Sequence, residues 1–438
     1  MMALLLRSEA ILSIQNYHFP QIGKWAGGGL EHRSPIPQSA VHILIITGDA
    51  MLPLTHRMEL FSEHFFAGLN SRVAALQAQG CDIIRLDEGS PDLPPAPHII
   101  EALSRAARRP DTHSYQPHRG FAELRQAWAG MYQRLYGVTI DPEREVLPLL
   151  GSKEGIFHLP LAFVDPGSVV LVPDPGYITY TRGARLAGGE PYFLPLLPER
   201  GFLPDLHAVP SDVVQRAKIL WLNYPNNPTA ATTSLDFFAE AVAFAREHNL
   251  LLCHDAAYAQ VTFDGYRAPS LLEVPGAKEA CVEFNTLSKS HNMAGWRVAA
   301  LIGNAAVIQA MYTLKTNVDS GYFRPLMEAA VAAMTGDQTW LQARNDTYRQ
   351  RRDVVLQTLH RLGLQAETPR ASLYVWFTIP HGQTSAAFAA ALLERAHISL
   401  IPGSVFGSGG EGYIRLSVTA PIERVEEAML RLESAFRA

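Results

Sequence analysis

The sequence has 438 residues, of which 47% are hydrophobic and 18% charged, and its formal net charge is -5. This length favours two domains, while the composition excludes a disordered chain and offers no basic surface for nucleic acid or an anionic membrane. The three cysteines lie far apart without a CxxC pair, which argues against a disulfide scaffold or a zinc site. Since no apolar run approaches the roughly 20 residues of a membrane helix, we expect a cytoplasmic protein without a membrane partner.

The first fifty residues differ from the rest of the chain. They contain Gly27-Gly28-Gly29, scattered prolines and balanced charges, with one short apolar run at Ile43–Ile46. We expect residues 1–50 to form a poorly ordered N-terminal extension. Two interpretations stay open, a gene-model extension upstream of a natural start at Met51, which we favour, and a targeting or regulatory arm. The segment is not rich in arginine, so a transit peptide or a DNA-binding arm is poorly supported.

From about Val146 onward, short apolar runs alternate with helix-like stretches, which predicts a largely parallel α/β sheet. The expected strands are Val169–Val172, Ile219–Leu222, Leu250–Cys253, Val282–Asn285 and Val298–Ile302. Between them, Leu235–Glu247 has the apolar spacing of three and four that predicts an amphipathic helix. In such sheets ligands bind beyond the carboxyl ends of the strands, and this is where the unusual residues of the chain fall.

Two candidate features come early in this region. Gly151-Ser152-Lys153-Glu154-Gly155 follows an apolar run and precedes a helix-like stretch, so its free backbone N–H groups can bind an anion. A single glycine-rich turn of this kind is a weak signal. Tyr177, just past Pro175-Gly176, is either ordinary packing or an aromatic cover for a planar ring.

The next two polar segments also follow expected strands. Asn223-Tyr224-Pro225-Asn226-Asn227-Pro228-Thr229 is rich in turn-forming residues, and it is either a structural loop or a rigid mount for an Asn amide. In Asp255-Ala256-Ala257-Tyr258 the carboxylate is either a helix N-cap or the partner that keeps a pyridine nitrogen protonated. In the second case Tyr258 can donate to the phenolic oxygen of the same ring.

Lys289 ends the segment Thr286-Leu287-Ser288-Lys289, which directly follows another expected strand. Taken alone, it is best interpreted as a surface lysine whose stem lies along apolar residues. Arg297 comes eight residues later, where we expect the next strand to open. A nucleophilic amine beside a fixed cation is what a carbonyl cofactor bearing a phosphate requires, so the pair makes a cofactor lysine the better interpretation.

After about residue 330 the pattern predicts a smaller α+β domain. The expected helices are Trp340–Leu362, Ser385–His397 and Ile422–Phe436, and the expected strands are Leu373–Thr378, Ile398–Ile401 and Tyr413–Val418. We expect the segment around Phe61–Leu86 to join this domain. Within Tyr413-Ile414-Arg415-Leu416-Ser417, an arginine inside an apolar strand is costly unless paired, and its fork suits a substrate carboxylate.

In order and spacing, these segments resemble the class I and II aminotransferases of fold type I, which bind pyridoxal phosphate (PLP). The resemblance runs from about residue 55 to the C-terminus. It implies an α/β fold with a large domain on a mostly parallel central sheet and a smaller α+β domain. The implied divisions are 51–90 as N-terminal arm and part of the small domain, 91–330 as the large PLP-binding domain, and 331–438 as the C-terminal small domain.

The resemblance also implies a role for each candidate residue. Lys289 holds PLP covalently and is the base for the proton transfer, and Asp255 pairs with the ring nitrogen. Asn227 and Tyr258 contact the 3-oxygen of the ring, and Tyr177 stacks on it.

The remaining implied contacts hold the phosphate and the substrate. The residues that hold the phosphate are Ser152, Lys153, Ser288 or Thr286, and Arg297. Arg415 takes the substrate α-carboxylate, with Asn227 and with Gly89 of the substrate loop Asp87-Glu88-Gly89-Ser90-Pro91. Tyr115 matches a tyrosine that reaches the phosphate of the neighbouring subunit, so a homodimer with shared active sites is expected. No metal is expected.

Within the family, three stretches look closest to the LL-diaminopimelate aminotransferases. They are Phe263-Asp264-Gly265-Tyr266 with Pro269-Ser270-Leu271-Leu272, Lys315–Gly321, and Tyr374-Val375-Trp376. Two features depart from the family pattern. Ala230 ends the motif that is usually NPTG, and Asp87-Glu88 replaces small or apolar residues in the substrate loop. An acid there can repel a dicarboxylate side chain or attract a distal ammonium group, and both effects stay open.

The implied function is a PLP-dependent aminotransferase that moves an amino group between an amino acid and a 2-oxo acid, with LL-diaminopimelate and 2-oxoglutarate as one candidate pair. An alanine or aspartate aminotransferase, or a β-elimination on the same fold, stays open. A non-catalytic PLP-binding regulator is the distant alternative. Such a regulator carries an N-terminal DNA-binding module, which the charge-balanced first fifty residues do not resemble.

Overall fold

The computed structural model describes residues 45–47, 50–52, 55–60 and 65–437, and the chain forms two compact units, residues 1–54 and 55–438. In the first unit, β1 (Ile45–Thr47) and β2 (Ala50–Leu52) form an antiparallel pair, which the sequence did not predict. The expectation of a poorly ordered extension over residues 1–50 otherwise lies outside the described residues.

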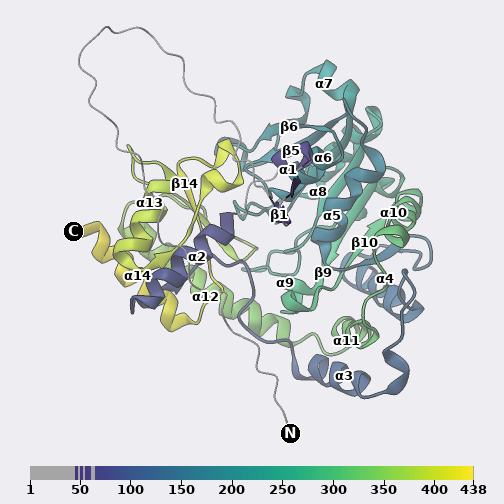
Figure 1. Cartoon of the computed structure of the whole chain (residues 1–438), viewed down its shortest axis with the longest axis horizontal. Coiled ribbons are helices and arrows are strands. Elements are labelled where there is room, and N and C mark those ends of the chain that lie inside the picture. The colour runs from purple at the N-terminus through teal and green to yellow at the C-terminus, as the bar shows by residue number, and fades with distance from the viewer. Residues whose placement is uncertain (1–44, 48–49, 53–54, 61–64, 438) are drawn as a thin grey trace. The chain divides into compact units, whose positions relative to one another are not determined.

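A seven-stranded sheet forms the centre of the second unit, with helices on both of its faces (Figure 1). The strand order is β4 (Val146–Leu149), β10 (Ala299–Gly303), β9 (Cys281–Thr286), β8 (Leu251–Asp255), β7 (Ala217–Leu222), β5 (Val169–Asp174) and β6 (Glu190–Pro195). β10 runs in the opposite direction to the other six strands, and the remaining pairs are parallel, so the predicted largely parallel α/β sheet is confirmed.

Alternate side chains of the strands enter two separate hydrophobic clusters, one on each face of the sheet. On β7, Ile219 and Trp221 enter one cluster and Leu220 and Leu222 the other. Because successive side chains of a strand point to opposite faces, strands buried on both sides are apolar throughout. The first cluster includes side chains of α5 (Ser152–Phe163), α6 (Thr179–Leu186) and α10 (Ala305–Val318). The second includes those of α3 (Pro97–Ala107), α4 (Ala122–Tyr136), α8 (Leu235–Glu247) and α11 (Arg324–Thr335).

A second, smaller sheet follows residue 330 and has the order β11 (Tyr374–Thr378), β14 (Tyr413–Ser417) and β13 (Ile401–Pro402). It packs in a third cluster with α12 (Trp340–Arg361) and α14 (Ile422–Arg437), which confirms the predicted mixture of helices and strands. These elements, drawn in green and yellow, lie together in Figure 1.

Two elements in this region differ from the prediction. The helix expected over Ser385–His397 is α13 (Ser385–Ala391) followed by one π-helical turn, and it ends where His397 adopts a left-handed φ of 56°. The strand expected over Ile398–Ile401 is two strands, because the chain changes sheets between them. β12 (Ile398–Ser399) pairs in parallel with β3 (Ile84–Arg85), whereas β13 pairs with β14.

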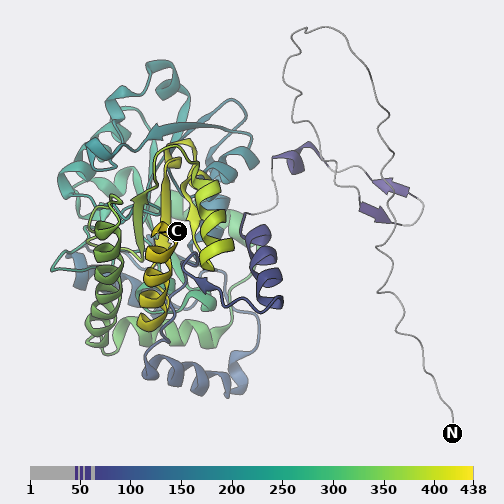
Figure 2. The same cartoon turned by 90° about the vertical axis from the view of Figure 1, so that its left-hand side faces the viewer.

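The segment before the large sheet lies against the C-terminal elements. In Figure 2, α2 (Phe65–Ala78, purple) runs beside the yellow helices, and its Val73 and Leu76 pack with Leu393. The domain boundaries that we expect at residues 90 and 330 remain predictions. None of the described helices combines the length and apolar character needed to cross a membrane.

Candidate active site

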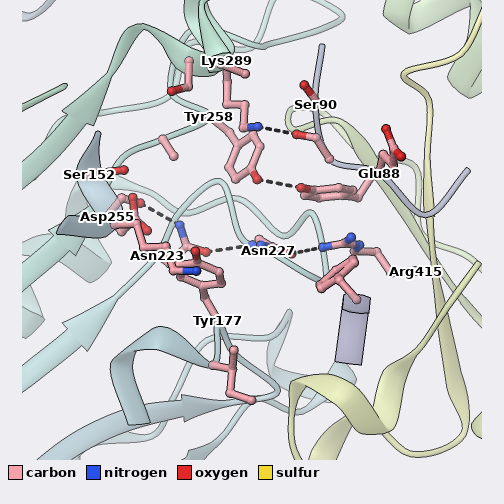
Figure 3. A pocket seen from close by; sticks show the side chains of 18 of the residues that line it. Glu88, Ser90, Ser152, Tyr177, Asn223, Asn227, Asp255, Tyr258, Lys289 and Arg415 are labelled. Atoms are coloured by element: carbon pink, nitrogen blue, oxygen red, sulfur yellow. Dashed lines mark hydrogen bonds between the residues drawn. The ribbon is translucent and has the colours of Figure 1, made fainter. Parts of the chain in front are cut away.

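The carboxyl ends of β5, β7, β8 and β9 border a cavity of about 550 Å³ (Figure 3). All but one of the residues predicted from the sequence line it, namely Gly89, Ser152, Lys153, Tyr177, Asn227, Asp255, Tyr258, Thr286, Ser288, Lys289, Arg297 and Arg415. The exception is Tyr115, which is 93% exposed and does not line the cavity.

Lys289 enters the cavity from α9 (Leu287–Ser290), the short helix that follows β9. Thr286 caps this helix by accepting a hydrogen bond from the backbone N–H of Ser288. The Nζ atom of Lys289 donates to the carbonyl oxygen of Gly89 (Figure 3). Burial, and then the cations Arg415 and Arg297, lower the pKa of Lys289 to about 8. A neutral amine is nucleophilic, so this environment prepares Lys289 to attack a carbonyl group near neutral pH.

Asp255 is the last residue of β8 and is buried. Its Oδ2 accepts from the hydroxyl of Tyr180 at 2.8 Å, whereas its buried Oδ1 has no hydrogen-bond partner in the described part of the chain. Burial raises the pKa of Asp255 to about 6. A buried carboxylate oxygen without a partner is costly, and a cationic ring N–H group is a ligand that would relieve this cost.

Asn223 and Asn227 connect Asp255 to the opposite wall of the cavity. The side-chain amide of Asn223 donates to the backbone carbonyl of Asp255 at 2.7 Å and accepts from the backbone N–H of Asn227 at 2.8 Å. The Oδ1 atom of Asn227 accepts from Nη1 of Arg415 at 2.8 Å (Figure 3). This chain of hydrogen bonds fixes the orientation of the Asn227 amide.

The start of α5 provides an anion-binding region. Gly151 has a φ of 81°, and a Cβ atom added to it would lie 2.1 Å from Nη2 of Arg297, so the guanidinium sits against the bare backbone. Lys153, Arg182 and Arg297 all line the cavity, and burial, followed by the other two cations, lowers the pKa of Lys153. Together with the N-terminus of α5, they suit a phosphate group. Arg297 does not open β10 as expected, because it lies in a left-handed turn (φ 56°) two residues before that strand.

Arg415, on β14, is 3% exposed. Its Nη2 donates to the backbone carbonyl of Asp87 at 2.9 Å, and its guanidinium carbon lies 4.2 Å from the ring centroid of Tyr374 and 4.8 Å from that of Phe406. Its Nε has no partner in the described residues. A buried guanidinium whose contacts are carbonyls and rings can still take a carboxylate.

Asp87 and Glu88, the two acids of the loop after β3, have different surroundings. Asp87 is fully buried, and Nε and Nη2 of Arg85 each donate to its carboxylate at 2.7 Å. Glu88 lines the cavity with its side chain 55% exposed, and its Oε1 lies 3.1 Å from Nη2 of Arg85. The acid that faces a ligand is therefore Glu88 alone.

Sequence reasoning missed several residues of the site. Tyr374 lines the cavity, and its hydroxyl lies 2.8 Å from that of Tyr258. Nothing near it in sequence signals this contact, since the two tyrosines are 116 residues apart. Arg85 was missed as well, although the carboxylate that it binds, that of Asp87, lies only two residues further along the chain.

Arg344 on α12 was also missed. Its Nη1 donates to the backbone carbonyls of Lys289, at 2.9 Å, and of Ser290, and its Nη2 donates to that of Gln260 at 2.8 Å. Burial lowers the pKa of Arg344 to about 10. Arg344 is buried on α12 together with Tyr348, four residues later, and Val355, seven residues after that. Because these spacings place the three residues on one face of a helix, the sequence could have shown that Arg344 points inward.

The cavity thus combines three features that a carbonyl-bearing pyridine phosphate would use. They are an amine with a lowered pKa, a buried carboxylate oxygen that lacks a partner, and a cationic helix N-terminus. The donor set therefore fits PLP on the side of the large sheet, and Arg415 offers a carboxylate site on the other side.

Comparison with known proteins agrees with this geometry. Residues 81–432 match the family described as aminotransferase class I and II. The LL-diaminopimelate aminotransferase of Moorella thermoacetica is 49% identical over 376 residues, which cover 86% of this chain and 96% of that protein. The substrate-bound structure of BacF from Bacillus subtilis has a TM-score of 0.85 with 38% identity, and covers 88% of this chain and 98% of that one. A single mutant of the aspartate aminotransferase of Thermus thermophilus has a TM-score of 0.82 with 30% identity, over 88% and 100% of the two chains.

Proposed function

The chain belongs to the class I and II aminotransferases, and we propose that it uses PLP to transfer an amino group from LL-diaminopimelate to a 2-oxo acid such as 2-oxoglutarate. The reaction type follows from the family. The amino donor is proposed from the relatives, which at 45 to 49% identity are LL-diaminopimelate aminotransferases.

The observation that carries the proposal is the convergence of Lys289, Asp255 and Arg415 on one cavity. Lys289 would bind PLP covalently, and the unpartnered Oδ1 of Asp255 would hold the proton on its ring nitrogen. Tyr177 would cover the ring, while Asn227 and Tyr258 would contact its 3-oxygen. The phosphate would lie on the start of α5, where Ser152, Lys153, Thr286, Ser288 and Arg297 line the cavity.

When bound, PLP supplies an electron-accepting ring that stabilises negative charge on the α-carbon of the substrate. Arg415 binds the α-carboxylate, and Asn227 holds the guanidinium in place through the hydrogen bond to Nη1. The Nζ atom of Lys289, once free, takes the proton from the α-carbon, and its lowered pKa keeps it neutral enough to act as a base. Arg344 holds the backbone carbonyls of Lys289 and Ser290, which fixes the backbone from which this amine extends.

The test is a steady-state assay of the PLP-loaded protein with LL-diaminopimelate and 2-oxoglutarate, in which glutamate formation is measured. Alanine and aspartate are assayed as alternative donors. We expect LL-diaminopimelate to be the best donor, and Lys289→Ala to lower kcat by at least about 10³-fold, since it removes both the covalent anchor and the base. Lys218→Ala, which changes an exposed lysine of β7 away from the cavity, is the matched control.

Each outcome addresses a different part of the proposal. Turnover of Lys289→Ala at the wild-type rate would contradict the assignment of the lysine. A preference for alanine or aspartate would contradict the donor and leave the reaction type in place. Release of ammonia and pyruvate from an amino acid without an acceptor would indicate β-elimination in place of transamination.

We also propose that the active form is a homodimer in which Tyr115 reaches the phosphate of the partner's cofactor. The 93% exposure of Tyr115 and its place outside its own cavity support this proposal. Light scattering should give twice the chain mass of 48.2 kDa, and Tyr115→Phe should weaken PLP binding. A monomer with full activity would contradict it.

A further inference from the structure

The charged side chains that line the cavity have distinct neighbours. Lys153 at the start of α5, Arg182 on α6 and Arg297 line the cavity and interact with one another, and Asp255 ends β8. Lys289 and Arg415 contact the backbone of the loop after β3. The two lining charges outside these contacts are Arg85 and Glu88.

The loop around Glu88 is anchored through three consecutive backbone carbonyl oxygens, each of which accepts a hydrogen bond from a side chain. That of Asp87 accepts from Arg415 at 2.9 Å, that of Glu88 accepts from the hydroxyl of Thr419 at 2.8 Å, and that of Gly89 accepts from Lys289. Glu88 therefore lies between two anchored residues. Its neighbour on one side is bound by Arg415, the proposed carboxylate-binding arginine, and its neighbour on the other side is bound by the amine of Lys289. These contacts fix the backbone from which the Glu88 side chain extends at the wall of the cavity.

The charges near Glu88 do not balance. Arg85 is bound in a fork to the carboxylate of Asp87, and the same Nη2 atom lies 3.1 Å from Glu88 and 2.8 Å from Oδ1 of Asn70. Within the group of Arg85, Asp87 and Glu88, one guanidinium thus lies between two carboxylates, so these three side chains together carry about one negative charge. A ligand ammonium would neutralise it, whereas a ligand carboxylate would be repelled.

We propose that Glu88 is a specificity-determining residue that binds a distal ammonium group on the amino donor, with Arg85 orienting its carboxylate. This inference rests on the proposed function, because it deepens the choice of substrate at the same site. It answers the question left open by the sequence, since Asp87 is neutralised inside the protein and only Glu88 meets the ligand. The substrate class is an amino acid with an ammonium group at its far end, in preference to a simple dicarboxylate.

The experiment compares Glu88→Gln with wild type in the PLP-loaded protein. LL-diaminopimelate carries both an ammonium group and a carboxylate at its distal end, whereas glutamate carries a distal carboxylate only, so the two donors differ there by the ammonium group. Because the variant removes a charge-assisted hydrogen bond to the substrate, kcat/KM for LL-diaminopimelate should fall by about 10-fold, mainly through KM. For glutamate kcat/KM should rise, because the repulsion is removed. Glu123→Gln, an exposed acid of α4 outside the cavity, should change neither value.

A binding measurement separates this role from catalysis. LL-diaminopimelate is titrated by calorimetry into PLP-loaded Lys289→Ala and into the double variant that also carries Glu88→Gln. The double variant should bind LL-diaminopimelate more weakly than Lys289→Ala, by a factor similar to the loss in kcat/KM. Equal changes for the two donors, or no change for either, would overturn the proposal. If wild type uses LL-diaminopimelate and Glu88→Gln has no selective effect, the subsite is wrong and the proposed function stands. If wild type rejects LL-diaminopimelate but Glu88→Gln still lowers activity with lysine or ornithine relative to glutamate, the subsite stands and the proposed donor is wrong.

Discussion

The two walls of the cavity are built in different ways. The wall on the large sheet is built at the carboxyl ends of parallel strands, by residues such as Asp255, which ends β8, and Lys289, which follows β9. The facing wall joins distant parts of the chain, since Arg415 binds the carbonyl of Asp87 across 328 residues. The proposed cofactor contacts are therefore a local consequence of strand order, whereas the proposed substrate contacts depend on how the smaller sheet packs.

The largest effect should come from the wall on the large sheet. Asp255→Asn removes the charge that would keep the ring nitrogen protonated but preserves the shape of the side chain. Since loss of one well-placed electrostatic group costs about 10² to 10³-fold, we expect kcat to fall by about 10³-fold. The measurement is kcat at saturating PLP, with Asp236→Asn on the exposed part of α8 as control. A loss of less than about threefold would contradict the role of Asp255.

The facing wall should affect binding more than chemistry. Arg415→Gln leaves the hydrogen-bond capacity near Asn227 but removes the charge that binds the α-carboxylate. We expect kcat/KM to fall by about 100-fold, mostly through KM, because the loss of a buried charged partner costs several kcal/mol. Arg395→Gln, an exposed arginine outside the cavity, is the control. If KM stays constant while kcat falls, Arg415 does not bind the substrate carboxylate in the way proposed.

The same difference explains what could be predicted from the sequence. The apolar strands, the helix Leu235–Glu247 and the residues after each strand end follow from local periodicity and the rule that ligands bind at the carboxyl edge. Contacts such as that between Tyr258 and Tyr374 depend on packing over more than a hundred residues, and no local pattern encodes them. The opposite surroundings of Asp87 and Glu88 were missed because the loop was interpreted as a pair of acids.

The pH dependence of cofactor binding should give an intermediate effect. With a pKa of about 8, the neutral fraction of Lys289 rises from about a tenth at pH 7 to about nine-tenths at pH 9. The rate at which the cofactor-free protein takes up PLP should therefore rise by about 10-fold over this range and then level off. Between about pH 8 and pH 10.4, Lys289 is mostly protonated in the unfolded chain but mostly neutral in the folded protein. Because the unfolded state then binds more protons, the free energy of unfolding of the cofactor-free protein should rise as pH rises through this window. A midpoint near 10.4 for PLP uptake would contradict the environment described for Lys289.

The smallest effect concerns the contact between the two walls. The hydroxyl of Tyr258, which lies in the segment after β8, is 2.8 Å from that of Tyr374 on β11. We expect Tyr258→Phe and Tyr374→Phe each to lower kcat/KM only a few-fold, and the double variant to lose less than the product of the two, with a coupling of about 1 kcal/mol. Strict additivity would mean that the two walls act independently.

The central claim is that Lys289 at the edge of the large sheet binds PLP covalently. The most direct measurement is reduction of the PLP-loaded protein with borohydride, followed by peptide mapping by mass spectrometry. The account predicts one pyridoxyl phosphate group, located on the peptide that contains Lys289. A modification on another lysine, such as Lys153 in the same cavity, or none at all, would contradict it.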